Sequence, residues 1–235
     1  MGRFTVIPQS TFDELQLDAG VLLKQFNPAS PTAPADADII CATTGGINAS
    51  CVATFSDMGE DVDNCPNNMK ELKHLDSWEC KMGFTALGTS PEFIKMSLGA
   101  ADVSGATYAL TSDSAINTSK TYYTRSGTSP NYTYTKVTSP VVGSIGTYYE
   151  MTSPDYMITP RRDLEQTDFE DAIWWVGDRS DGGMVAIKLM NALSTGGFSI
   201  QTTKSGKGQI SVELMGHFSI DAQNTVPMVF YSTEG

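Results

Sequence analysis

Two segments near the C-terminus carry apolar side chains at every second position, and this pattern limits the possible folds most. The first runs from Phe198 through Ile200 to Thr202, and Ser205-Gly206-Lys207-Gly208 then predicts a turn. A period of two indicates a strand with one buried face. The second strand continues for eleven residues, with one face made of Ile210, Val212, Leu214, Gly216, Phe218 and Ile220. The sequence therefore predicts a long β-hairpin and an antiparallel sheet.

The rest of the chain predicts further strands and one helix. Apolar residues alternate from Trp78 to Ala86, which indicates a half-buried strand. Ser90-Pro91-Glu92 supplies a cap, a first-turn proline and an acidic residue, so we expect a helix over 91–101. Three apolar runs have the length of strands, at 173–176, 184–193 and 228–231. The predicted fold class is mainly β.

The composition changes between Ser104 and Ile158. This segment holds eight of the nine tyrosines and no phenylalanine, tryptophan or cysteine, and it repeats Thr-Tyr-Tyr at 121–123 and 147–149. Dense Ser, Thr and Tyr with interspersed proline indicate short strands and turns. We therefore expect a small β-rich insertion, residues 104–158, between two parts of one core, residues 1–103 and 159–235. A long, partly disordered loop is the alternative.

Charge and targeting signals exclude several classes of protein. The chain has 27 acidic and 15 basic residues, a net charge of −12, which argues against gripping a nucleic-acid backbone. The first twenty residues lack the apolar stretch of a secretory signal, and no apolar run reaches the roughly 18 residues that span a bilayer. We expect a protein made in the cytoplasm, with reduced cysteines and no membrane insertion.

The residues that usually carry chemistry form no catalytic pattern. The two histidines, His74 and His217, both fall in predicted strands, and the four cysteines include no C-x-x-C pair. The acidic run over 57–64 lacks the residue order of a calcium loop. Five carboxylates before the 173–176 strand are best explained as a charged surface connection: Asp163, Glu165, Asp168, Glu170 and Asp171. We therefore expect no active site, no metal and no cofactor.

Four segments resemble one family, the major tail tube proteins of long-tailed bacteriophages that infect Gram-positive hosts. They are LQLDAGVLLKQF (15–26), FSDMGEDVDNCPNNMKELK (55–73), ITPRRDLEQTDFEDAIWWVGD (158–178) and AIKLMNALSTGGFSIQTTKSGKGQISVELMGHFSI (186–220). Together they span most of 15–102 and 158–235. The tyrosine-rich segment is then an insertion into the family core.

The resemblance implies a phage tail-tube fold of two packed antiparallel β-sheets with one flanking α-helix. Subunits of this family form rings of six that stack into a hollow tube in the virion tail. The implied partners are other copies, a tape-measure protein, tail-terminator or tail-tip proteins, and viral DNA that passes without specific binding. An acidic wall would let DNA slide, so the acidic loop residues Asp57, Glu60, Asp61 and Asp63 are candidates for the lumen or the ring-to-ring contact.

The apolar hairpin is a second candidate surface, because unprotected strand edges pair between subunits. Its candidate assembly residues are Phe198, Ile200, Ile210, Val212, Leu214 and Phe218. Two other classes of function stay open. A carbohydrate- or host-binding β-sandwich module could use the tyrosine-rich segment as its binding face. An acid–base hydrolase using the carboxylates of 163–171 is the less favoured reading, because no paired roles can be assigned.

Overall fold

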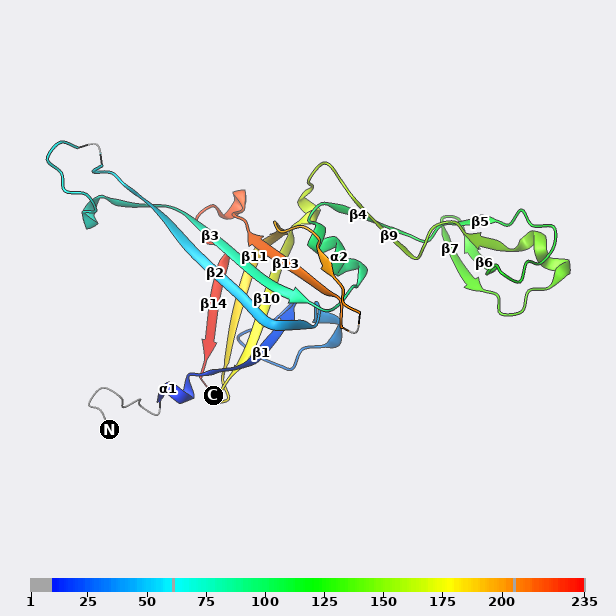
Figure 1. The fold of residues 1–235 in the computed structure, drawn as a ribbon, viewed down its shortest axis with the longest axis horizontal. Helices are drawn as coiled ribbons and strands as arrows, with labels where there is room; N and C mark the ends of the chain where they lie inside the picture. Colours follow the sequence, from blue (N-terminus) through cyan, green and yellow to red (C-terminus); the bar gives the residue numbers. More distant parts are fainter. Residues whose placement is uncertain (1–9, 61, 205, 235) are drawn as a thin grey trace. The chain divides into compact units, whose positions relative to one another are not determined.

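The computed structural model describes residues 10–60, 62–204 and 206–234, which belong to two compact units (Figure 1). The first unit, here called the body, is Met1–Ala100 with Arg162–Gly235, and the second, the insert, is Ala101–Arg161. Strands hold 46% of the residues, about twice the share usual in globular proteins. All strand pairs are antiparallel, so the predicted mainly β class is confirmed.

One eight-stranded sheet forms most of the body. Its order is β1-β10-β11-β13-β3-β2, with β12 beside β13 and β14 beside β11. The strands are β1 (Gln16–Leu23), β2 (Thr43–Asp57), β3 (Lys73–Ala86), β10 (Glu170–Arg179), β11 (Met184–Ser194), β12 (Ile200–Gln201), β13 (Gln209–Gly216) and β14 (Met228–Thr233). The body helices are α1 (Ser10–Asp13) and α2 (Pro91–Leu98), with short 3₁₀ turns η1 (Asp36–Asp38), η2 (Lys70–Leu72), η4 (Gln166–Asp168) and η5 (Ile220–Ala222).

Strand β11 divides this sheet into two halves. On one side it pairs with β10, and on the other it pairs first with β14, over 184–189, and then with β13, over 192–194. The two halves, β1-β10-β11-β14 and β13-β3-β2, enclose one core. Its buried side chains come from both halves and from α2, including Leu22, Met82, Phe84, Phe93, Trp175, Leu189, Leu214 and Met228. The core thus lies between two halves of one continuous sheet, whereas two separate packed sheets were predicted.

The two neighbouring tryptophans of β10 serve opposite faces of the sheet. Trp175 lies in the main core, and its indole Nε1 donates to the backbone oxygen of Ala19 (3.0 Å). Trp174 points to the other face, where its ring meets Phe26 and Tyr231 at 5.7 and 5.5 Å. The loop after β1 therefore covers the outer side of this half of the sheet.

Local sequence patterns account for β3 and α2. Cys80, Met82, Phe84 and Ala86 are buried at alternate positions of β3, as predicted. The Ser90 hydroxyl caps α2 by accepting from the backbone N–H of Phe93 (3.3 Å). The helix ends at Leu98 rather than at residue 101, because Gly99 takes a positive φ of 80° and turns the chain into the next strand.

The predicted C-terminal hairpin is correct in its buried face but too long at both ends. Ile210, Val212 and Leu214 are buried, whereas β13 ends at Gly216, and Ile220 lies in η5 with 83% of its surface exposed. The reason is competition, since β14 occupies the part of β11 along which β13 would have continued. Phe218 is exposed outside any strand, and Phe198 lies before the two-residue strand β12. His217 follows the strand rather than lying in it.

Two strands of the body were not predicted from the sequence. Strands β1 and β2 lack a clear alternation of apolar and polar residues, and β3 begins five residues before Trp78.

The carboxylate run over 163–171 is not only a surface connection, because Asp168 is just 6% exposed. Its carboxylate accepts from the backbone N–H of Glu165 (2.8 Å) and caps η4.

The insert folds as two small antiparallel sheets. Its strands are β4 (Ala101–Gly105) with β9 (Tyr156–Pro160), and β5 (Tyr108–Leu110), β8 (Tyr149–Met151), β6 (Tyr123–Thr128) and β7 (Asn131–Lys136) in that spatial order, with η3 (Val142–Thr147) before β8. Tyr122 and Tyr148 are buried with their rings 5.7 Å apart. The Tyr122 hydroxyl donates to Asp113 Oδ2 (2.8 Å), so the insert has a small core of its own. The predicted insertion, 104–158, lies within this unit.

The buried face of β13 can be tested with a matched pair of substitutions. We expect Val212→Lys to lower the free energy of unfolding by at least about 3 kcal/mol, because it places an unpaired charge in the core. Ser211→Lys, on the exposed face, should change it by no more than about 0.5 kcal/mol. Urea unfolding followed by tryptophan fluorescence measures both. Equal effects would mean that the strand register is shifted by one residue.

The β4–β9 ladder offers a clean way to remove the insert. Val103 and Ile158 are cross-strand partners, so a two-residue Asn-Gly turn can replace 104–157 and close a hairpin. We expect the shortened chain to fold, with a cooperative thermal transition reported by the three tryptophans, all of which lie in the body. We also expect the same state of assembly as the full chain. An insoluble product, or loss of the cooperative transition, would show that the insert is needed to fold the body.

Candidate functional site

Strands β2 and β3 continue past the core as a two-stranded arm, defined here as residues 52–77. The core contacts of these strands stop at Cys51 and Trp78, and every residue of β3 from Lys73 to Ser77 is exposed. Figure 1 shows the hairpin running away from the other strands of the body to the loop that joins β2 and β3. A hairpin of two strands is marginally stable in water without a third element. The arm therefore needs a further surface to pack on.

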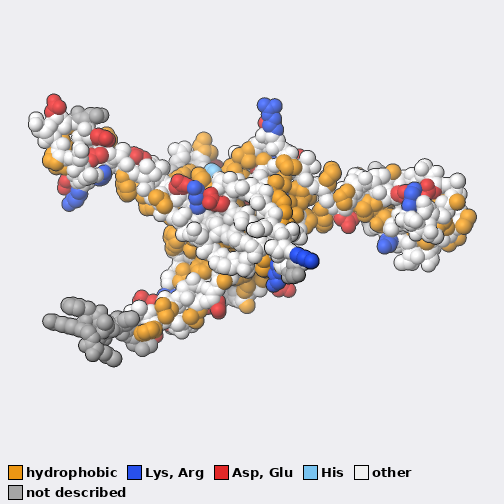
Figure 2. Space-filling model, in the orientation of Figure 1, with side chains coloured by type: hydrophobic (Ala, Val, Ile, Leu, Met, Phe, Trp, Pro, Cys, Tyr) orange, Lys and Arg blue, Asp and Glu red, His pale blue; other side chains and the backbone are white. Residues whose placement is uncertain are grey.

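The arm carries large apolar side chains in water. Phe55 and Leu75 face each other across the two strands and are 58% and 43% exposed. Further exposed apolar residues lie along the arm and its loop, namely Val52, Met58, Val62 and Met69. Figure 2 shows hydrophobic side chains on the surface of this arm. Several exposed large apolar side chains on one short hairpin are typical of a site of interaction with another protein or another copy.

The outer edge of β2 is unpaired, although near Ile47 the strand lies beside β1. In the described part of the chain β3 is the one strand that pairs with β2, so the other edge offers unpaired N–H and C=O groups. From Thr43 to Ser56 the strand contains no charged residue and no proline. Monomeric proteins usually protect long edges with charge, proline or short length. The residues from Thr43 to Ser56 lack charge and proline, so this edge is suited to pairing with another strand.

Asp57 organises the loop at the end of the arm. Its carboxylate accepts from the backbone N–H groups of Gly59 (3.0 Å) and Asn68 (2.6 Å), and Lys73 Nζ lies 3.8 Å away. The two backbone hydrogen bonds, that of Gly59 first, lower the pKa of Asp57. Asn68 holds a positive φ of 64° at this turn. Asp57 thus stabilises the loop, and its carboxylate interacts with groups of the arm itself.

The other predicted site residues fall into three groups. Glu60 and Asp63 are exposed on the arm loop, and Asp61 lies outside the described residues. Of the six hairpin candidates, Ile210, Val212 and Leu214 belong to the body core, where they are unavailable for contacts between subunits. The exposed three are Phe198, Ile200 and Phe218. Sequence reasoning missed the arm and the β2 edge, although the absence of charge from residue 43 to 56 was a usable signal.

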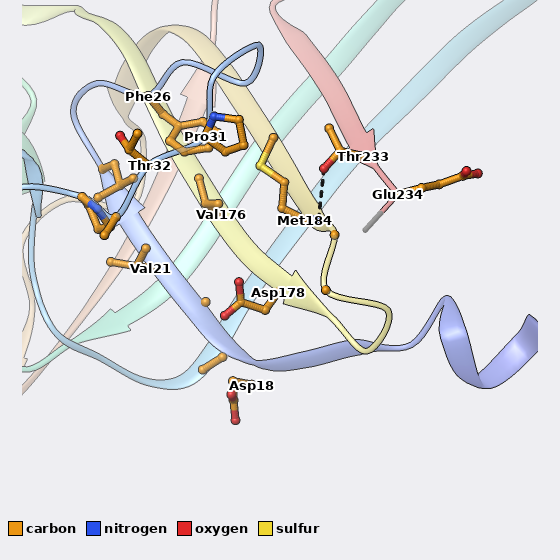
Figure 3. Close-up of a pocket in the computed structure, with 17 residues that line it drawn as sticks. Asp18, Val21, Phe26, Pro31, Thr32, Val176, Asp178, Met184, Thr233 and Glu234 are labelled. Atoms are coloured by element: carbon orange, nitrogen blue, oxygen red, sulfur yellow. Dashed lines mark hydrogen bonds between the residues drawn. The ribbon is translucent and has the colours of Figure 1, made fainter.

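A cleft of about 1040 Å³ lies beside β1, β10 and the end of β14 (Figure 3). Its wall is mainly apolar, with Val21, Phe26, Val176 and Met184, and Asp18, Asp178 and Glu234 add three carboxylates. Figure 3 shows Glu234 pointing away from the other lining side chains. The lining contains no Ser, Cys, His, Lys or Arg side chain. Its hydroxyl groups are those of Thr32 and Thr233, and Thr233 Oγ1 accepts a hydrogen bond from the backbone N–H of Met184 (3.2 Å).

The two histidines lie in different surroundings outside this cleft. Ser56, His74 and Asp76 lie near one another on the arm, but the Ser56 hydroxyl donates to Asp76 Oδ1 (2.8 Å), so no histidine activates it. His217 Nδ1 lies 3.2 Å from the backbone oxygen of Asn191 and its ring packs against Phe169. Among the described residues no three His, Cys, Asp or Glu side chains are grouped to hold a metal ion.

The cysteines are free thiols with a packing role. Cys51 and Cys80 are cross-strand partners with their Sγ atoms 3.2 Å apart. Burial raises the pKa of Cys80 to about 12 and that of Cys41 to about 11, so these two thiols stay protonated near neutral pH. Protonated thiols are poor nucleophiles and poor metal ligands.

The comparisons with known proteins leave the family open. No protein-family model matches the chain, and no curated protein matches it significantly. In the part of the chain that the structure describes, none of the helices has the length and apolar character needed to cross a membrane.

The role of Asp57 predicts a local effect on the arm loop. Because its pKa is lowered, the carboxylate stabilises the loop at neutral pH, and this contribution is lost only when the pH falls through the lowered folded-state value. Lys70 is already exposed, so its cleavage by trypsin depends on how firmly the loop backbone is held. We expect Asp57→Ala to loosen the loop and speed cleavage at Lys70 several-fold at pH 7, with the tryptophan-monitored unfolding of the body unchanged. Asp63→Ala removes a similar charge from the same loop and should leave the cleavage rate as it is. Equal rates in both variants would contradict the role of Asp57.

Proposed function

We propose that this protein is a self-assembling structural subunit, the tail tube protein of a long-tailed bacteriophage. In this proposal six copies form a ring, rings stack into a hollow tube in the virion tail, and the tube conducts DNA. The observation that carries the proposal is the open, uncharged edge of β2 together with its apolar arm. The resemblance of four segments to tail tube proteins supplies the specific identity.

Edge pairing between copies explains why the β2 edge is unprotected. A second open edge is available on β14, which pairs only with β11 among the described strands and carries no charged residue from Met228 to Thr233. Pairing of one edge with a different edge of the next copy is a head-to-tail contact, and such contacts close into rings when the rotation permits. Ring closure by this contact would satisfy the β2 and β14 edges of every copy, as closure does for the strands of a barrel.

The arm supplies a contact of a different kind. Burying half-exposed side chains such as Phe55 and Leu75 against a neighbouring copy would contribute on the order of 1 kcal/mol each. The same burial would give the two-stranded arm the third surface that it lacks. We assign the arm to contacts between copies, with the exposed Glu60 and Asp63 at its end.

The charge distribution suits a conduit. The insert has four acidic and four basic residues, so the whole net charge of −12 belongs to the body. A tube wall built from acidic bodies repels DNA and lets it pass, whereas a basic wall would hold it. In the tail, the inferred partners are a tape-measure protein inside the tube and tail-terminator or tail-tip proteins at its ends. The proposed role requires no cofactor.

Assembly tests the proposal directly. We expect negative-stain electron microscopy of the purified protein to show rings or tubes with a central hole as concentration rises. Phe55→Lys should stay monomeric by light scattering while keeping the thermal midpoint of the wild type, because the charge falls on the arm and not in the core.

Thr202→Lys adds the same charge at an exposed position off the arm and should assemble like the wild type. A wild-type monomer at every concentration would overturn the proposed self-assembly. If Phe55→Lys forms rings, the proposed self-assembly stands, but the arm does not contribute to the contacts between copies.

A further inference from the structure

The four-stranded sheet of the insert gathers tyrosines on one face. Cross-strand partners share a face, and the pairs are Tyr123 with Lys136, Arg125 with Tyr134, Gly127 with Tyr132, Tyr123 with Tyr149 and Tyr108 with Met151. We call this surface the tyrosine face, made of Tyr108, Tyr123, Tyr132, Tyr134, Tyr149, Arg125 and Lys136. The opposite face carries Thr124, Ser126, Thr133 and Thr135. The buried Tyr122 and Tyr148 precede β6 and β8 by one residue.

The rings of the tyrosine face are held in place by one another. Tyr108 stacks on Tyr134 at 4.0 Å between ring centroids, with 10° between the planes. Tyr123 meets Tyr108 edge to face at 5.0 Å, and Tyr149 meets Tyr134 in the same way at 5.4 Å. Packed rings lose little conformational freedom when a ligand binds. The result is a rigid, partly exposed surface of aromatic carbon and phenolic hydroxyl groups.

Two cations on this face have no acidic partner. Arg125 lies over the rings of Tyr132 and Tyr149, with its Cζ 4.3 and 4.8 Å from their centroids, and among the described residues no carboxylate pairs with it or with Lys136. The acidic residues of the insert are mostly used elsewhere. Lys120 binds Asp113 (2.9 Å) and Glu150 (3.0 Å), and Arg161 binds Asp102 (3.1 Å). The fourth, Asp155, lies close enough to Tyr108 to help raise its pKa, after the larger effect of burial.

An unpaired guanidinium is unexpected in a chain with twelve more acidic than basic residues. The two rings fix the orientation of Arg125, so its N–H groups are presented in a defined plane. A planar fork of this kind binds a carboxylate with two parallel hydrogen bonds. Charge complementarity therefore indicates an anionic group in the ligand.

The size of the face limits the ligand. Strands of six residues are about 20 Å long, strands of three about 10 Å, and neighbours lie about 4.8 Å apart. The face thus covers on the order of 300 Å², well below the roughly 800 Å² per partner of a stable protein interface. A strip of this size fits a few sugar rings. Sugars match its chemistry, because their C–H faces pack on aromatic rings and their hydroxyls bond to phenols and to Arg.

We propose that the tyrosine face of the insert binds a carboxylate-bearing glycan, with Arg125 holding the carboxylate and the tyrosines holding the sugar rings. Single-stranded nucleic acid fits less well, because its backbone needs a row of cations and the cations of this face are Arg125 and Lys136. This binding site is independent of the assembly proposed above, so either can fail without the other.

The test is calorimetric titration of the full-length protein with three probes: tetragalacturonate, the neutral galactotetraose, and a short oligothymidylate. We expect tetragalacturonate to bind and the other two to bind at least about tenfold more weakly, since a charge-assisted hydrogen bond contributes about that much or more. Arg125→Gln should weaken the binding of tetragalacturonate by about tenfold to a hundredfold. Lys204→Gln removes the same charge from an exposed position of the body and should leave binding unchanged.

Two further variants separate binding from folding. Arg125→Lys keeps the charge but loses the fork, so its affinity should fall between those of the wild type and Arg125→Gln. Tyr134→Ala opens the stack and should also weaken binding, whereas Thr133→Ala on the opposite face should not. The far-ultraviolet circular dichroism spectrum and the thermal midpoint confirm that each variant keeps its fold. Absence of wild-type binding, equal affinity for the neutral sugar or the oligothymidylate, or unchanged binding by a folded Arg125→Gln would each overturn the proposal.

Discussion

The divided pairing of β11 is the constraint on which the body depends. Each position of a strand offers one partner on each side, so β14 and β13 share the second side of β11 between them. The change of partner coincides with Asn191, which has a positive φ of 48° and donates through Nδ2 to the backbone oxygen of His217 (2.9 Å). The chain of β13 therefore turns away at Gly216. The sheet folds over at this line, and its two halves close on one core.

The same closure leaves the edges that we assign to assembly. Core packing uses β3 from Trp78 onward and leaves the preceding residues in water with their partners on β2. Because β2 is last in the sheet order, nothing inside the described chain satisfies its outer edge. From Thr43 to Ser56 the strand has no charged residue where an isolated protein would need protection. The body therefore has a buried core but also an unpaired strand edge, which is consistent with the proposed role as a subunit of an assembly.

Sequence patterns predicted the elements whose signals are local. Alternation identified β3 and the buried face of β13, and apolar runs identified β10 and β11. Strand β2 was missed because its identity comes from pairing with β3 and not from its own hydrophobicity. The end of β13 depends on which part of β11 is already paired with β14, and no local pattern encodes that tertiary contact. The two Tyr-Tyr pairs show the same limit. Composition set the segment apart, but only register shows that Tyr122 and Tyr148 are buried while Tyr123 and Tyr149 join the exposed face.

The body carries the whole net charge of −12, whereas the insert is neutral, and this difference fits their different proposed roles. Body copies with a charge of −12 repel one another, yet this repulsion is screened beyond about 8 Å at physiological salt, whereas paired edges and buried apolar side chains act at contact. Assembly through an uncharged strand can therefore prevail over the net charge. The neutral insert pairs three of its four carboxylates with Lys120 and Arg161 and leaves Arg125 beside tyrosine rings. Its surface is suited to an external ligand, while the surface of the body is suited to another copy of itself.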